Sequence, residues 1–159
     1  MVTLAHVEGL LRAAAIRCTA RTADTTHGFF LTALPMGEDL LSVLAREGSN
    51  RIKGGGVGPW RAGELRELRT RLAQPRPTRS REEVSRCLTD WFRGGNEASP
   101  TDDRVAVALA DAVMLDLDTL LGSGWHAEQS PLRPTAAYAD ALLLLGPTAR
   151  MLLELSRDD

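Results

Sequence analysis

The stretch Thr101–Leu121 is the longest helical pattern in the chain, and it contains neither glycine nor proline. Apolar residues recur along it at three- and four-residue spacing, as one buried helix face requires. They are Val105, Ala108, Leu109, Ala112, Val113, Leu117 and Leu120. We therefore expect a long helix at the centre of the fold, with this set of residues facing the core.

Asp116 falls inside this apolar stripe, whereas Asp111 and Asp118 fall on the opposite side of the helix. A carboxylate buried among apolar side chains must be hydrogen-bonded, paired or protonated. We interpret Asp116 as a buried structural group whose partner is an arginine, a tryptophan indole N–H or a helix N-terminus. The candidate partners in this sequence are Arg17, Arg150 and His126.

The rest of the chain also favours helix over strand. Aromatic residues make up 4% of the sequence, and alanine, leucine and arginine dominate it. Further helices are predicted at residues 3–20, 37–48, 63–73, 80–93 and 135–156, the last broken or kinked at Gly146-Pro147 into 135–145 and 148–156. The short apolar segment 29–34 is expected to be helical, although its length also fits a strand, and residues 125–133 are expected to be irregular. The best supported of these begins at Ser80, which forms a capping box with Glu83. The expected fold is all-α, a single helical domain over residues 1–159 with six or seven helices and no significant sheet.

Composition places the chain among ordinary globular proteins. Its 159 residues are 43% apolar and 25% charged, which suits one domain with its own core. The run Leu142–Leu145 is too short to cross a bilayer, so no contact with a membrane is expected. Cys18 and Cys87 look like buried free thiols, which fits a cytoplasmic location. Only Lys53 among 19 basic residues is a lysine, and this arginine bias suggests a bacterial or phage protein.

Charge is unevenly distributed along the chain. Residues 46–86 carry a net charge of +6 and residues 87–159 a net charge of −7, within a total of −2. Such a contrast fits internal complementarity, an anionic partner or self-association. However, the arginines of the basic segment do not share one helix face, and glutamates are interleaved among them. A solvated charged surface is therefore favoured over a nucleic-acid-binding stripe.

The glycine-rich loop at residues 53–58 is the main candidate for a binding site. Glycine backbone ahead of a helix N-terminus can hold an anion, and basic and aromatic side chains flank this loop. The spacing matches neither a Walker loop nor a dinucleotide-binding fingerprint. A second break in the helices is the proline-bearing connector at residues 74–79. The candidate partner- or anion-binding residues are Arg51, Lys53, Gly54, Gly55, Gly56, Trp60 and Arg61.

No residue set in the sequence predicts catalysis. The three histidines lie far apart, no metal-ligand spacing is present, and no nucleophile stands with a base, so we expect no catalytic residues, metal or cofactor. The leading hypothesis is a non-enzymatic interaction module that binds another protein or itself. The alternatives are binding of nucleic acid or another polyanion through residues 46–86, and a small metal-dependent all-α hydrolase that uses buried carboxylates.

Overall fold

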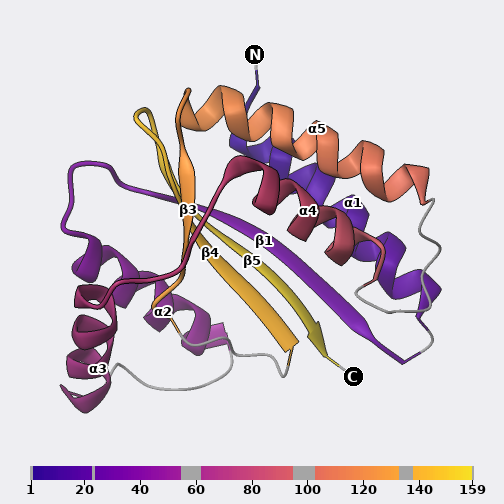
Figure 1. The fold of residues 1–159 in the computed structure, drawn as a ribbon. Helices are drawn as coiled ribbons and strands as arrows, with labels where there is room; N and C mark the ends of the chain where they lie inside the picture. The colour runs from indigo at the N-terminus through magenta and orange to yellow at the C-terminus, as the bar shows by residue number, and fades with distance from the viewer. Residues whose placement is uncertain (1, 23, 55–61, 95–102, 133–137, 159) are drawn as a thin grey trace.

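The computed structural model describes residues 2–22, 24–54, 62–94, 103–132 and 138–158. Within these residues the chain forms an α+β fold of five helices and one antiparallel five-stranded sheet (Figure 1). The helices are α1 (Leu4–Arg21), α2 (Leu40–Gly54), α3 (Ala62–Ala73), α4 (Arg81–Phe92) and α5 (Arg104–Leu121). The strands are β1 (Thr26–Leu34), β2 (Thr78–Arg79), β3 (His126–Gln129), β4 (Tyr138–Leu145) and β5 (Arg150–Asp158). The strand order across the sheet is β1-β5-β4-β3-β2.

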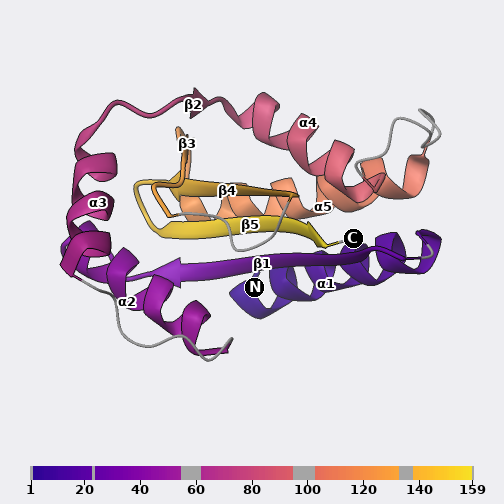
Figure 2. The ribbon, with the colours of Figure 1, turned by 90° about the horizontal axis from the view of Figure 1, so that it is seen from below.

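The larger core lies between one face of the sheet and the helices α1, α4 and α5 (Figures 1 and 2). Side chains alternate between the two faces of a strand, so β1 directs Phe29 and Leu31 into this core. The paired positions of β5 and β4 add Leu153 and Leu142 to the same face. Helix α5 contributes, among others, Leu117.

A smaller core covers part of the opposite face. Val43 and Leu44 of α2 and Leu68 of α3 pack there with Leu34 at the end of β1 and with Leu143 of β4. Because β4 lies in the middle of the sheet with apolar residues on both faces, its middle residues are completely buried. Strands β4 and β5 therefore contribute residues to a core on each face of the sheet.

The prediction of an all-α fold is wrong, and the error lies in four segments. Residues 29–34, 135–145 and 148–156 were expected to be helical, but they contribute to β1, β4 and β5, and the segment expected to be irregular contains β3. A strand buried on both faces shows a continuous apolar run instead of alternation, and such a run resembles a buried helix. Leucine also favours helix locally, but pairing with neighbouring strands decides the conformation here.

The capping box predicted at the start of helix 80–93 is confirmed. Thr3 caps α1 through a bond from the His6 backbone N–H to its hydroxyl oxygen, and Ser80 and Glu83 form the expected reciprocal capping box of α4. Helix α5 exists as predicted, but its buried face is rotated. Its buried residues are Ala106, Ala110, Val113, Met114, Asp116, Leu117 and Leu121, whereas Val105 is 53% exposed.

Candidate interaction surface

Strand β1 forms one edge of the sheet, and the only strand that pairs with it in the described part of the chain is β5. It is nine residues long, whereas β2 at the opposite edge has two residues. A short edge strand offers little to another chain, but a long one presents a row of backbone donors and acceptors. The two edges of this sheet are therefore not equivalent.

The direction of the backbone groups on β1 follows from one contact. The His27 N–H donates to the Thr19 hydroxyl oxygen at 2.9 Å, so at this residue the backbone points away from β5 and toward α1. Backbone direction alternates along a strand, so the N–H and C=O groups of Phe29, Leu31 and Ala33 also point outward. No backbone hydrogen bond to these outward groups occurs among the described residues.

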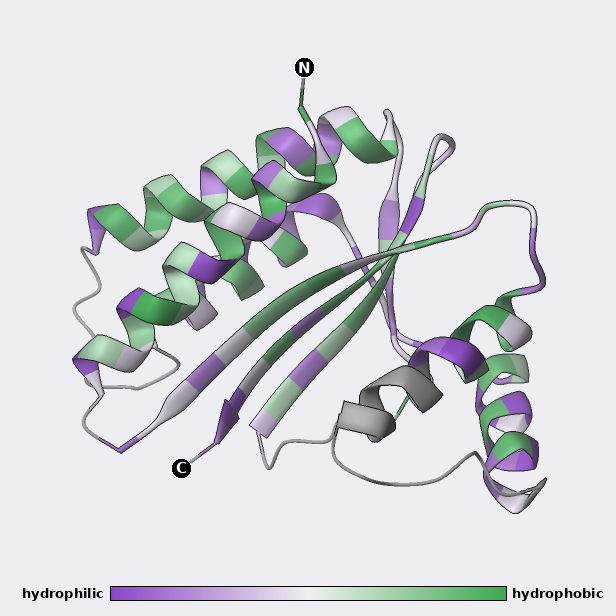
Figure 3. Cartoon of the chain, turned by 180° about the vertical axis from the view of Figure 1, so that it is seen from behind, coloured by the Kyte–Doolittle hydropathy of each residue, from purple (hydrophilic) through white to green (hydrophobic). Residues whose placement is uncertain are grey.

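Strand β1 carries none of the features that usually protect a sheet edge. Thr26–Leu34 contains no aspartate, glutamate, lysine, arginine or proline, and its register with β5 runs without a bulge. In Figure 3 the strand is green or pale over most of its length. An uncharged, regular and unpaired edge of this length is open to strand addition.

A groove of about 840 Å³ lies between this edge and the outer side of α1. Its two most exposed apolar side chains are Ile16, which is 61% exposed, and Phe30, which is 59% exposed. Glu8 and Arg12 of α1 add charged groups to the wall. The groove therefore combines apolar side chains, unpaired backbone groups and charges of both signs.

Phe30 lies close to Gly28 on the same strand. A Cβ atom on Gly28 would stand 2.8 Å from the Phe30 ring and 2.9 Å from the Ser156 hydroxyl oxygen. The ring occupies space that only glycine leaves free at that position. Gly28 thus sets the position of the aromatic ring beside the groove.

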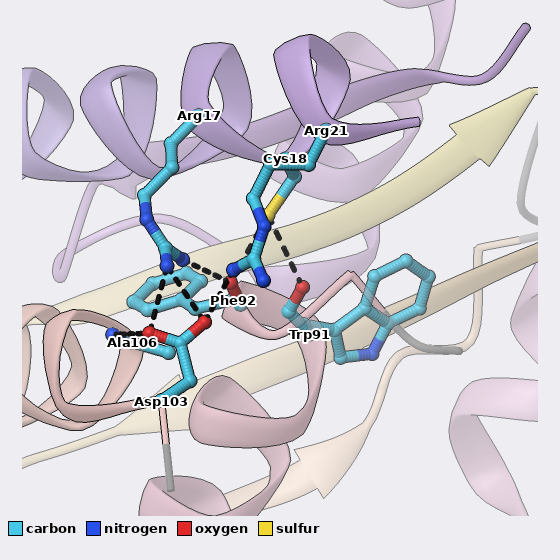
Figure 4. A network of polar contacts seen from close by, with 7 residues as sticks. All are labelled: Arg17, Cys18, Arg21, Trp91, Phe92, Asp103 and Ala106. Atoms are coloured by element: carbon cyan, nitrogen blue, oxygen red, sulfur yellow. Dashed lines mark hydrogen bonds and ion pairs between the residues drawn. The ribbon is translucent and has the colours of Figure 1, made fainter. Parts of the chain in front are cut away.

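An ion-pair network holds α1, and with it the groove wall, in place (Figure 4). Arg17 donates to both carboxylate oxygens of Asp103 at 2.7 and 2.6 Å, and Arg21 donates to the same carboxylate at 2.5 Å. Asp103 also caps α5 by accepting the Ala106 N–H at 3.0 Å. Arg17 further donates to the Phe92 carbonyl at the end of α4. One carboxylate therefore links α1 to α5, and Arg17 extends the link to α4.

The charge state of Asp103 follows from these contacts. Burial acts to raise the pKa of its carboxyl group, but hydrogen bonds from Arg17, the Ala106 N–H and Arg21 outweigh burial and hold the pKa well below its usual range. Asp103 is therefore ionised at neutral pH. It acts as a fixed anion between helices.

A second, more polar cavity of about 420 Å³ lies beside α4. There Asp140 accepts hydrogen bonds from Arg79 at 3.2 Å and from the Trp91 indole N–H at 3.0 Å. The Cys87 thiol lies 3.7 Å from the same carboxylate. Burial and the Asp140 charge raise the pKa of Cys87 to about 11, so this thiol is not an activated nucleophile.

The predicted site at the glycine-rich loop lies largely outside the described residues. Arg51, Lys53 and Gly54 belong to the last turns of α2, and Gly55, Gly56, Trp60 and Arg61 fall outside the described ranges. These seven residues therefore stay a prediction. Several arginines of segment 46–86 form ion pairs within the chain; the pairs are Arg46–Glu38, Arg71–Glu67, Arg76–Glu128, Arg79–Asp140 and Arg81–Asp118.

Asp116 is buried, as its place in the helical pattern indicated, but its partner is His6 of α1. The His6 Nδ1 atom lies 2.9 Å from Asp116 Oδ2, which forms an ion pair when the imidazole is protonated. No oriented hydrogen bond to that oxygen forms among the described residues.

The three expected partners of Asp116 contact other groups. Arg17 binds Asp103, Arg150 donates to the Glu38 carbonyl, and His126 lies 3.7 Å from Glu128. Sequence reasoning missed His6 because it considered no histidine near the N-terminus as a partner on a facing helix.

The other aspartates of α5 do not gather at one point. Asp111 is exposed, while Asp118 is bound by Arg81 and by the Trp125 indole N–H at 2.8 Å. Within the described ranges, no group of three or more histidine, cysteine, aspartate or glutamate side chains is placed to hold a metal ion. Ile16 of α1 and Phe30 of β1, the most exposed apolar residues of the groove, belong to no recognisable motif in the sequence.

Comparisons with protein families, with curated proteins and with solved structures found no match to this chain. Among the described residues, no helix is long and apolar enough to span a bilayer. A cytoplasmic location stays a prediction.

Proposed function

We propose that this protein is an interaction module that binds an extended segment of a partner protein by strand addition along β1. The observation that carries the proposal is the uncharged, nine-residue free edge of β1 that opens into the groove beside α1. In this mode of recognition, backbone hydrogen bonds supply affinity and alternate side chains supply specificity.

The geometry of the edge limits the bound segment. Thr19 already occupies the His27 N–H, so the backbone ladder for a partner runs over Phe29, Leu31 and Ala33. Outward groups recur at every second residue, so these positions engage a segment of about five residues. The segment is expected to be extended and free of proline.

The two walls of the groove limit the side chains of the segment. One set of alternate side chains faces α1, where Ala15, Ile16 and Ala20 line the groove. The other set lies beside Phe30 and Thr32 on the opposite face of β1. Both walls are mainly apolar, so a partner with apolar residues at alternate positions fits this site.

Binding can be measured with a library of random nonapeptides displayed on phage. The library is selected on the wild-type protein and counter-selected on the Ala33→Pro variant. Ala33 is exposed and its N–H points outward, so proline removes a donor from the free edge without removing a bond to β5. We expect enriched peptides to bind Ala33→Pro about tenfold more weakly, because one backbone hydrogen bond is lost and the proline ring crowds the edge.

Amide hydrogen exchange locates the bound peptide. A selected peptide should slow exchange at Phe29, Leu31 and Ala33. Ile16→Lys should weaken binding, and Leu115→Lys, a matched exposed leucine on α5, should leave it unchanged. Protection at other segments, or equal binding by Ala33→Pro, would contradict strand addition at β1.

A further inference from the structure

Helix α5 carries an apolar stripe on the side that faces away from the core. Leu115 is 67% exposed and Val105 is 53% exposed, while Ala108 is exposed and Ala112 is half-buried between them. On one flank of α5 Asp116 meets His6 of α1, and on the other flank Arg81 at the start of α4 binds Asp118. The stripe lies between these flanks and is separate from the groove at β1.

The stripe has the spacing of a helix-packing seam. Positions 105, 108, 112 and 115 are separated by three, four and three residues, as in a pair of interlocked helices. The spacing is also symmetric about Ala110. A second α5 that runs antiparallel across the stripe therefore places Val105 against Leu115 of the other copy, and Ala108 against Ala112.

We propose that α5 is a dimerisation face, which pairs with α5 of a second copy of this chain in antiparallel orientation. A two-fold interface requires a surface that is complementary to itself, and the symmetric spacing meets that requirement. The two alanine layers lie at the centre, so the helices can approach closely there. The larger valine and leucine side chains close both ends of the seam.

The charges beside the stripe favour the antiparallel orientation. Arg104 and Asp118 lie on the same flank of α5, fourteen residues apart, at opposite ends of the seam. An antiparallel second copy brings Arg104 of each chain near Asp118 of the other. In a parallel pair the two copies of this flank lie on opposite sides of the seam, so no such opposite-charge pair forms. Asp111 of the two copies meet near the axis, where the positive charge of Arg81, which binds Asp118, acts electrostatically on its own Asp111. Charge therefore selects one orientation.

The size of the seam predicts a reversible dimer. An 18-residue helix is about 27 Å long, and one helix pair lies at the small end of specific protein interfaces. We expect a dissociation constant on the order of 10 µM. The dimer should therefore be visible in sedimentation velocity runs at protein concentrations between roughly 1 and 300 µM.

Charge introduction at the seam tests the proposal. Val105→Glu and Leu115→Lys should each weaken dimerisation at least tenfold, because each buries unpaired charges in the interface. The double variant should regain it, because the introduced carboxylate at position 105 faces the introduced ammonium at position 115 of the other copy. Met36→Lys, which changes a comparably exposed apolar residue outside both the stripe and the groove, should dimerise as the wild type does. Circular dichroism checks that every variant is folded.

The outcomes separate cleanly. The proposal would be overturned if the wild-type protein stays monomeric at 300 µM. It would also be overturned if neither single variant weakens the dimer, or if the double variant stays monomeric. Peptide binding at β1 does not depend on any of these results, since Leu115 lies outside the groove.

Discussion

The Thr19 hydroxyl oxygen accepts the His27 backbone N–H at 2.9 Å, and this contact joins the last turn of α1 to the free edge of β1. It uses the first outward donor of the strand and leaves those of Phe29, Leu31 and Ala33 for another chain. It also connects the groove to the rest of the molecule, because the position of α1 depends on the ion pairs that Arg17 makes.

The Asp103 carboxylate is bound by both Arg17 and Arg21 of α1. Asp103→Asn should lower the free energy of unfolding by about 3 kcal/mol at pH 7, because two arginines lose their counter-charge in a buried setting. The figure is at the low end for a buried pair, since the Arg21 side chain is 39% exposed. Urea unfolding of both proteins measures the difference.

The pH dependence of that difference follows from the direction of the Asp103 pKa. The pKa is lowered in the folded state, so its contribution to stability is complete above the unfolded value of about 4 and is lost as the pH falls toward the folded value. The gap between wild type and Asp103→Asn should stay constant from pH 7 to about 5 and shrink below about pH 4. Asp118→Asn serves as the control, because its carboxylate is 34% exposed and should contribute about 1 kcal/mol or less. A gap that grows in acid would contradict this account.

Replacement of Asp116 by an apolar residue should destabilise the protein less than removal of its partner His6. His6→Ala leaves a buried carboxylate without the imidazole beside it and should cost about 1–2 kcal/mol. Asp116→Leu removes the buried acceptor altogether and should lie within about 0.5 kcal/mol of the wild type or above it. Chemical denaturation of the two variants and of the double variant tests this order. If Asp116→Leu is the more damaging change, Asp116 has a role beyond pairing with His6.

Structural features that depend on residues close together in the sequence could be predicted. Features that depend on contacts between distant residues could not. The cap of α1 at Thr3 and the capping box at Ser80 involve residues three positions apart, so they are visible in the sequence. Strand β5 pairs with β1, more than a hundred residues away, and β4 is buried on both faces. Neither the pairing of β5 with β1 nor the burial of β4 on both faces can be recognised from residues that are close together in the sequence.

The two candidate surfaces are also the places where hydrophobic patterns misled. Phe30 is apolar but exposed between the buried Phe29 and Leu31, so it hides the alternation of β1. Val105 and Leu115 are apolar but exposed on α5, so they obscure which face of the helix is buried. Residues that break a folding pattern without structural benefit are expected at interaction sites.

Cys87 should react slowly with alkylating reagents. Its pKa of about 11 lowers the thiolate fraction at pH 8 on the order of a hundredfold relative to an ordinary thiol. Labelling by iodoacetamide in a Cys18→Ser background reports on this thiol alone. Asp140→Asn should speed the reaction severalfold, because removal of a neighbouring negative charge lowers the Cys87 pKa. Equal rates in the two proteins would show that the Asp140 charge does not act on the thiol.

Gly9 and Gly28 should respond in opposite ways to the same substitution. A Cβ on Gly9, within α1, meets nothing within 4 Å, so Gly9→Ala should stabilise the protein by about 1 kcal/mol through helix propensity. A Cβ on Gly28 would stand 2.8 Å from the Phe30 ring, so Gly28→Ala should displace that ring and cost about 1 kcal/mol. Thermal unfolding measures both changes. Gly28→Ala should also weaken the peptides selected on the groove, whereas Gly9→Ala should not. If both variants are stabilised equally, the Phe30 ring does not rest in the space above Gly28.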